Sequence, residues 1–158
     1  MKLKGLIDED FVNYKKPSMF ISTYTCSFKC DKECGQAVCQ NLPLVSQPTI
    51  EVDNKILVDR YLNNPITKAI VIGGLEPFDD AEDLYNFVHR VRWYSNDDIV
   101  IYTGYYEHEI QDYLFQYMAE FVNIVCKFGR YIPNQQPHYD EVLGVMLASD
   151  NQKGVRIC

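Results

Sequence analysis

Short apolar runs that each stop at a glycine constrain the fold of this 158-residue chain most strongly. The runs and the glycines that end them are Lys68–Ile72 with Gly73 and Gly74, Asp98–Thr103 with Gly104, and Phe121–Phe128 with Gly129. A nearly continuous apolar run is typical of a strand that is covered on both faces of a parallel sheet. The sequence therefore predicts a sheet whose central strands are buried, with glycine turns at their carboxyl ends.

Segments with helical periodicity alternate with these strands. They are Asp53–Leu62, a stretch with Leu84, Phe87, Val88 and Val91 on one face, and Glu107–Met118. Asp79 or Asp80 is expected to cap the second helix, and Asp79 with Glu82 matches part of a capping box. Met19–Tyr24 and Glu141–Leu147 are expected to add an early and a late strand. This alternation of strands and helices predicts an α/β fold with a mostly parallel sheet.

The composition is that of an acidic folded protein, and we expect one domain over residues 1–158. The net charge is −7 and the pI is about 4.9, whereas binding to nucleic acid requires clustered Lys and Arg. No apolar stretch is long enough to span a membrane, and the acidic start MKLKGLIDEDF lacks the apolar core of an export signal. We therefore expect a cytoplasmic protein with reduced thiols, whose partners include neither nucleic acid nor a membrane.

Four cysteines lie close together in the stretch TCSFKCDKECGQAVCQN, and they are Cys26, Cys30, Cys34 and Cys39. In a reducing compartment, clustered thiols favour a metal site over disulfides. Zinc sites usually contain CxxC pairs or histidines, and this stretch has neither. An iron–sulfur cluster accepts thiolates from irregular loops at close spacing, so it fits the stretch best. A zinc site, or no metal at all, remains as an alternative.

Several segments, taken in order, resemble the radical S-adenosylmethionine (SAM) superfamily, and most closely the activating proteins of anaerobic ribonucleotide reductase. Cys26-Ser-Phe-Lys-Cys30 and the later Cys39-Gln40-Asn41 are similar to the family's cysteine loop, whose third cysteine often precedes a pair ending in Asn. The other similar segments are Gly73-Gly74-Leu75-Glu76-Pro77, Thr103-Gly104-Tyr105, Lys127-Phe128-Gly129-Arg130-Tyr131 and Ser149-Asp150-Asn151-Gln152. The resemblance covers nearly the whole chain.

The resemblance implies a [4Fe–4S] cluster with one open iron, to which the amino and carboxylate groups of SAM bind. The implied cluster ligands are Cys26, Cys30 and Cys39. Cys34 would be a spare thiol, an alternative third ligand or a fourth ligand. The implied SAM-binding residues are Gly73, Gly74, Glu76, Pro77, Thr103 and Asn151. The resemblance also implies a partial, open TIM-like barrel of about five or six strands, with the cluster at the carboxyl edge of the sheet.

The implied function is the reductive cleavage of SAM to methionine and a 5′-deoxyadenosyl radical, which takes a hydrogen from a glycine of a partner. That partner would be a glycyl-radical enzyme such as an anaerobic ribonucleotide reductase, and an electron donor would reduce the cluster. One alternative is an electron-transfer, sensor or accessory protein that binds the cluster without SAM chemistry. Another is an interaction module stabilised by zinc.

Overall fold

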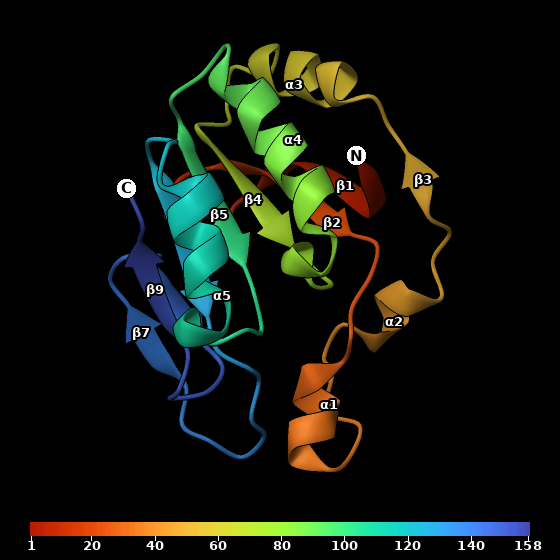
Figure 1. Cartoon of the computed structure of the whole chain (residues 1–158), viewed down its shortest axis with the longest axis vertical. Coiled ribbons are helices and arrows are strands. Elements are labelled where there is room, and N and C mark those ends of the chain that lie inside the picture. Colours follow the sequence, from red (N-terminus) through yellow and green to blue (C-terminus); the bar gives the residue numbers. More distant parts are fainter.

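The apolar strands form the centre of a seven-stranded sheet in the computed structural model, which describes all residues from 1 to 158. Across the sheet the order is β3 (Ile50–Glu51), β1 (Lys2–Asp10), β2 (Ser18–Thr23), β4 (Ala69–Gly73), β5 (Asp98–Tyr102), β6 (Ile124–Phe128) and β9 (Lys153–Arg156) (Figure 1). The pairings β2–β4, β4–β5 and β5–β6 are parallel, whereas β1 and β9 run antiparallel to their neighbours. The predicted α/β fold with a mostly parallel sheet is confirmed.

The sheet is open, because β3 and β9 lie at its two ends and each pairs with one neighbour. The expected partial barrel is not confirmed, and the sheet has more strands than the five or six that were expected. The missed strand β1 contains charged residues at Lys2, Lys4 and positions 8–10, so no apolar run marks it. It forms by pairing on both sides, from Leu3 opposite Thr23 to Asp10 opposite Ser18.

Two helices begin at aspartates that cap them. The α3 helix (Asn54–Leu62) follows Asp53, whose carboxylate accepts a hydrogen bond from the backbone N–H of Lys55 at 2.7 Å. The α4 helix (Ala81–Arg92) follows a short 3₁₀ turn, η1 (Pro77–Asp80), and Asp80 accepts from the N–H of Asp83. Of the two expected caps, Asp80 is confirmed. The capping box expected from Asp79 and Glu82 is wrong, because the Asp79 carboxylate accepts a hydrogen bond from the backbone N–H of Ser27 in the cysteine loop.

The later part of the chain departs from the expected boundaries. The helix expected over Glu107–Met118 consists of α5 (Glu107–Tyr113) followed by a π-helical turn, η2 (Leu114–Met118). The strand expected over Glu141–Leu147 is confirmed only at Val145–Leu147. That region forms a hairpin of β7 (His138–Asp140) and β8 (Val145–Leu147), because Asp140 accepts from the N–H of Leu143 and Gly144 turns the chain at φ 74°.

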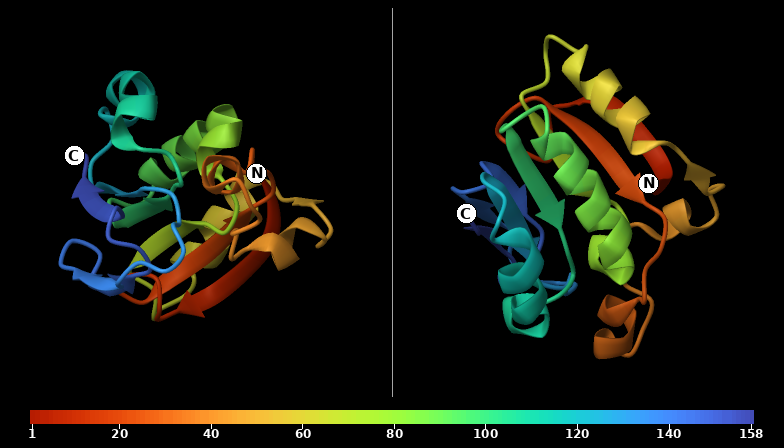
Figure 2. Two further views of the ribbon diagram at one scale, coloured as in Figure 1. Left: turned by 90° about the horizontal axis from the view of Figure 1, so that it is seen from below. Right: turned by 45° about the horizontal axis from the view of Figure 1, so that its top comes forward.

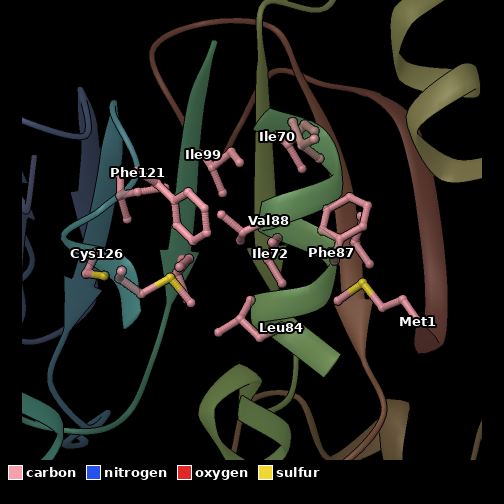
Figure 3. Close-up of a cluster of buried hydrophobic side chains, with 14 of the residues drawn as sticks. Met1, Ile70, Ile72, Leu84, Phe87, Val88, Ile99, Phe121 and Cys126 are labelled. Atoms are coloured by element: carbon pink, nitrogen blue, oxygen red, sulfur yellow. The ribbon is translucent and has the colours of Figure 1, made fainter. Parts of the chain in front are cut away.

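The two faces of the sheet are covered differently. Helices α3, α4 and α5 pack on one face, over a core cluster of 23 buried residues (Figure 2). Leu84, Phe87 and Val88 of α4 point toward the isoleucines of β4 and β5 (Figure 3). The other face has a cluster of seven buried residues, and the segment after β1 and the β7–β8 hairpin cover it. No helix is both long and apolar enough to cross a membrane.

Candidate iron–sulfur site

The cysteine loop follows β2 and lies beyond the carboxyl ends of the parallel strands (Figure 1). Phe28 adopts a left-handed conformation with φ 53°, which turns the chain into α1 (Lys29–Cys34), and its N–H donates to Cys26 Sγ at 3.3 Å. Gly35, also left-handed, ends α1. The expected position of the cysteines at the carboxyl edge of the sheet is confirmed by these elements.

The long gap between Cys30 and Cys39 is closed by one aspartate. Asp31 Oδ1 accepts hydrogen bonds from the backbone N–H of Val38 at 2.8 Å and of Cys39 at 2.9 Å. A carboxylate in the first turn of α1 thus holds the end of the loop beside its beginning. Cys39 therefore returns to the neighbourhood of α1, although eight residues separate it from Cys30 in the sequence.

Three of the four clustered cysteines line one cavity of about 360 Å³ at this edge. They are Cys26, Cys30 and Cys39, and Cys34 is not among the lining residues. No three His, Cys, Asp or Glu side chains lie close enough together to hold a single metal ion. Each thiolate of a [4Fe–4S] cluster binds a different iron, so a cluster requires a wider separation of its ligands than one ion does.

Gly104 forms the part of the cavity wall beside Cys30. A Cβ atom added to Gly104 would lie 3.5 Å from Cys30 Sγ and 3.6 Å from Glu76 Oε2, so the backbone of Gly104 approaches both side chains closely. Burial raises the pKa of the Cys26 thiol to about 11 and also raises the pKa of Cys30. Both thiols are therefore protonated when no metal is bound, and metal binding would release their protons. Three thiols around one cavity of about 360 Å³ fit an iron–sulfur cluster.

Glu76 is the central polar residue of the cavity wall, with 6% of its surface exposed. Its Oε1 accepts from Thr103 Oγ1 at 2.7 Å and from the Phe78 N–H at 3.1 Å, and its Oε2 accepts from the Gly104 N–H at 2.8 Å. Burial raises the pKa of Glu76 to about 7, although these three hydrogen bonds oppose the shift. The carboxylate is thus held rigidly in the wall by donors from two adjacent strand ends.

Of the other residues predicted for SAM binding near the end of β4, one lines the cavity and two are buried behind its wall. Gly74 lines the cavity with φ 79°, and its carbonyl accepts from Asn41 Nδ2 at 2.6 Å, which ties the cysteine loop to the end of β4. Gly73 is buried in β4, where a Cβ would lie 2.9 Å from Tyr102 Cβ. Pro77 is buried in η1 and does not line the cavity.

Asn151 and Gln152 are neighbours in the sequence, but their side chains lie in different places. Gln152 lines the cavity, where its Nε2 donates to the carbonyl of Gly129 at 3.3 Å. The side chain of Asn151 lies outside it and donates to the carbonyl of Arg130 at 2.9 Å. The structure thus brings together Cys26, Cys30, Cys39, Gly74, Glu76 and Thr103, but not Gly73, Pro77 or Asn151.

Lys127 is a cavity residue that the sequence pattern did not single out as a site residue. It is 8% exposed, and its Nζ donates to the carbonyl of Gly129 at 2.8 Å. Burial lowers the pKa of this lysine to about 8, while nearby Cys30 and Glu76 raise it. A lysine inside the apolar run FVNIVCKF was the available signal, because a charged residue is rarely placed in a buried strand without a partner.

The fold and the site define an α/β protein with a thiol-lined cavity at the carboxyl edge of its sheet. A family model for the 4Fe–4S single cluster domain matches residues 16–153, which include every cysteine that lines the cavity. The chain belongs to this family, and the match indicates a domain that binds a [4Fe–4S] cluster. No curated protein and no solved structure matches the chain.

Proposed function

We propose that the chain is a radical SAM activating protein that generates a glycyl radical on a partner enzyme. The observation that carries this proposal is that three features meet in one cavity: the thiols of Cys26, Cys30 and Cys39, the Gly74 turn, and the Glu76–Thr103 pair. Three thiolates leave one iron of a [4Fe–4S] cluster without a protein ligand, which is where an amino acid moiety would bind. Cys34, outside the cavity, would leave that iron open.

The chain's own residues would bind and orient SAM. Glu76, in its ionised form, offers a negative charge to the ammonium group of SAM, and Gly74 lets the backbone approach without a side chain. Thr103 holds the Glu76 carboxylate in place through its 2.7 Å hydrogen bond. When bound, the cluster supplies the electron for reductive cleavage of SAM to methionine and a 5′-deoxyadenosyl radical.

The proposed partner is a glycyl-radical enzyme such as an anaerobic ribonucleotide reductase, acting in the cytoplasm together with an electron donor. Support comes from the side of the cavity that no helix covers. Val12 and Met146 line the cavity there, with 75% and 60% of their surfaces exposed. Exposed apolar side chains beside a reactive cavity suit the docking of a protein segment.

Electron paramagnetic resonance of the anaerobically reconstituted and reduced protein, with and without SAM, tests this proposal. We expect a [4Fe–4S] signal whose shape changes when SAM is added. Cys39→Ala and Cys34→Ala form a matched pair, because both remove a thiol from the same loop. We expect Cys39→Ala to lose the cluster and Cys34→Ala to retain it together with the SAM response. The opposite result would assign Cys34 as the third ligand.

A second candidate is a cluster protein without SAM chemistry, acting as an electron carrier, sensor or accessory protein. The hydrogen bonds of Glu76 favour it, because the carboxylate already accepts from Phe78, Thr103 and Gly104. A [4Fe–4S] signal that is indifferent to SAM, together with no measurable SAM binding at equilibrium, would favour this candidate. A colourless protein that contains zinc would contradict both candidates.

A further inference from the structure

The helix that carries Cys30 lacks the usual means of attachment to a core. α1 has six residues, none of them buried, and no side chain caps its amino end. Its polar residues instead contact α5 and the segment after β6. Lys29 Nζ lies 3.3 Å from Glu109 Oε1 and 4.0 Å from the ring centroid of Tyr105, and Glu33 accepts from Tyr106 OH at 2.9 Å. Charged groups therefore fix the position of α1.

Arg130 lies at the centre of these contacts. Its Nη2 donates to Glu109 Oε1 at 2.7 Å, and its Nε lies 3.1 Å from Glu33 Oε2. The guanidinium also lies over the ring of Tyr106, 4.6 Å from its centroid. Through these contacts one side chain connects α1, α5 and the segment after β6. The hydrogen bond from Arg130 lowers the pKa of Glu109 to about 2, so this pair stays ionised even in mildly acidic solution.

The same arginine is buried and only partly satisfied. Arg130 is 5% exposed, and its Nη1 atom is buried without a hydrogen-bond partner, whereas Nε has the Glu33 carboxylate as its ion-pair partner. The aliphatic part of the Arg130 side chain and Cys30 both approach Gly104: a Cβ atom added to Gly104 would lie 3.5 Å from Cys30 Sγ and 4.0 Å from Arg130 Cγ. An unpartnered buried N–H group is costly, so it normally marks a place where another acceptor binds.

We propose that Arg130 positions Cys30 through Glu33 and Glu109 and that its positive charge raises the midpoint potential of the cluster. This inference rests on the cluster of the proposed function but not on SAM. A cation close to a cluster stabilises the reduced state, which has one more negative charge, and hydrogen bonds and charges around the sulfurs are known to set such potentials. Arg130 therefore couples the placement of a ligand to the electronic state of the cluster.

Redox titration of the full chain, reconstituted anaerobically and followed by electron paramagnetic resonance without SAM, tests the charge. We expect Arg130→Met to shift the midpoint potential to more negative values and Arg130→Lys to retain it. Glu33→Gln and Glu109→Gln remove negative charges, so they should shift it to more positive values. Arg60→Met is the matched control, because Arg60 pairs with Asp8 on the exposed face of α3. Equal potentials in all these variants would overturn the proposed role of the charge.

Hydrogen exchange of the metal-free protein tests the positioning. We expect faster exchange of the amides of residues 29–34 in Arg130→Met and Arg130→Lys, because neither can bridge Glu33 and Glu109 as a planar fork. Arg60→Met should leave α1 unchanged, and protected amides in β4 and β5 would show that each variant is folded. If Arg130→Met fails to fold, Glu33→Gln and Glu109→Gln provide the same comparison. Unchanged exchange in α1 would overturn the positioning role.

Both measurements are made without SAM, so their outcome is separate from that of the proposed function. A cluster signal that ignores SAM would contradict the activating function and leave the role of Arg130 intact. A cluster signal that changes with SAM, together with midpoint potentials that are the same in all Arg130 variants, would support the activating function and contradict the role of the Arg130 charge.

Discussion

Two helices of this protein, α4 and α1, are held in place by opposite kinds of interaction. α4 buries Leu84, Phe87, Val88 and Val91 against the sheet, whereas α1 buries no residue at all. α4 therefore depends on the hydrophobic effect, which is not directional and scales with buried apolar area. α1 depends on ion pairs and hydrogen bonds, which are directional and respond to charge, salt and single-atom changes. The core of the fold should therefore be sensitive to the loss of apolar side chains, and the cluster site to salt and to the loss of single charges.

The largest expected effect comes from breaking the apolar attachment of α4. Phe87 is fully buried, so Phe87→Ala should lower the free energy of unfolding of the metal-free protein by about 3–5 kcal/mol. Urea denaturation measures this change. Asn86→Ala, at an exposed position of the same helix, is the control and should change the free energy by less than about 0.5 kcal/mol. Similar effects of the two variants would contradict the assigned core face of α4.

The same contrast explains how much of the structure could be predicted from the sequence. The apolar stripe of α4 and the runs of β4, β5 and β6 have a periodicity that shows which face is buried, and the structure confirms them. The helix α1 was not predicted, because a short segment of charged residues and cysteines has no such periodicity. Its position results from Glu109 and Arg130, which are distant from it in the sequence.

The site residues were predictable to a similar, partial extent. Cysteine clustering and the Gly-Gly-Leu-Glu-Pro segment indicated the cavity edge, but the return of Cys39 depends on Asp31, which no motif marked. Asn151 was predicted from its neighbours in sequence, and its side chain instead turns toward the Arg130 carbonyl. Lys127 was marked in the sequence by its place in an apolar run, but only the structure shows that it lines the cavity.

A second prediction concerns the pH dependence of stability that the buried carboxyl group of Glu76 in the cavity wall should cause. Burial raises its pKa from the ordinary value of 4.5 to about 7 in the folded protein. Between these values the folded state binds a proton that the unfolded state lacks, so stability falls as pH rises from about 4.5 to 7, by about 3 kcal/mol in total. Above pH 7 both states are ionised and this contribution stays constant.

Urea denaturation of the metal-free protein at a series of pH values measures that slope. Glu76→Gln cannot ionise, so its stability relative to that of the unmodified protein should rise across this pH range. Glu82→Gln, which changes an exposed carboxylate in α4, is the control and should retain the slope. A slope that persists in Glu76→Gln would show that other groups cause it.

A third prediction separates the stability of the fold from the assembly of the site. Asp31→Ala removes the acceptor of the Val38 and Cys39 N–H groups, which are close to solvent. We expect a loss of about 1 kcal/mol or less in the free energy of unfolding, but a large fall in iron and sulfide bound per chain, because Cys39 is no longer held near Cys30. Lys32→Ala, an exposed change in the same helix, should retain the cluster. Full cluster content in Asp31→Ala would contradict the role of this carboxylate.

The smallest expected effect is that of salt, and it tests the comparison of the two helices without any substitution. Exposed charges are screened within about 3 Å at 1 M ionic strength, so the ion pairs of Lys29 and Glu33 should weaken, each by less than about 1 kcal/mol. Amide exchange in residues 29–34 of the metal-free protein should therefore be faster in 1 M sodium chloride than in dilute buffer. Exchange in α4 should stay the same or slow slightly, because salt does not weaken apolar burial. If α1 and α4 respond alike, contacts other than these ion pairs hold the cysteine helix.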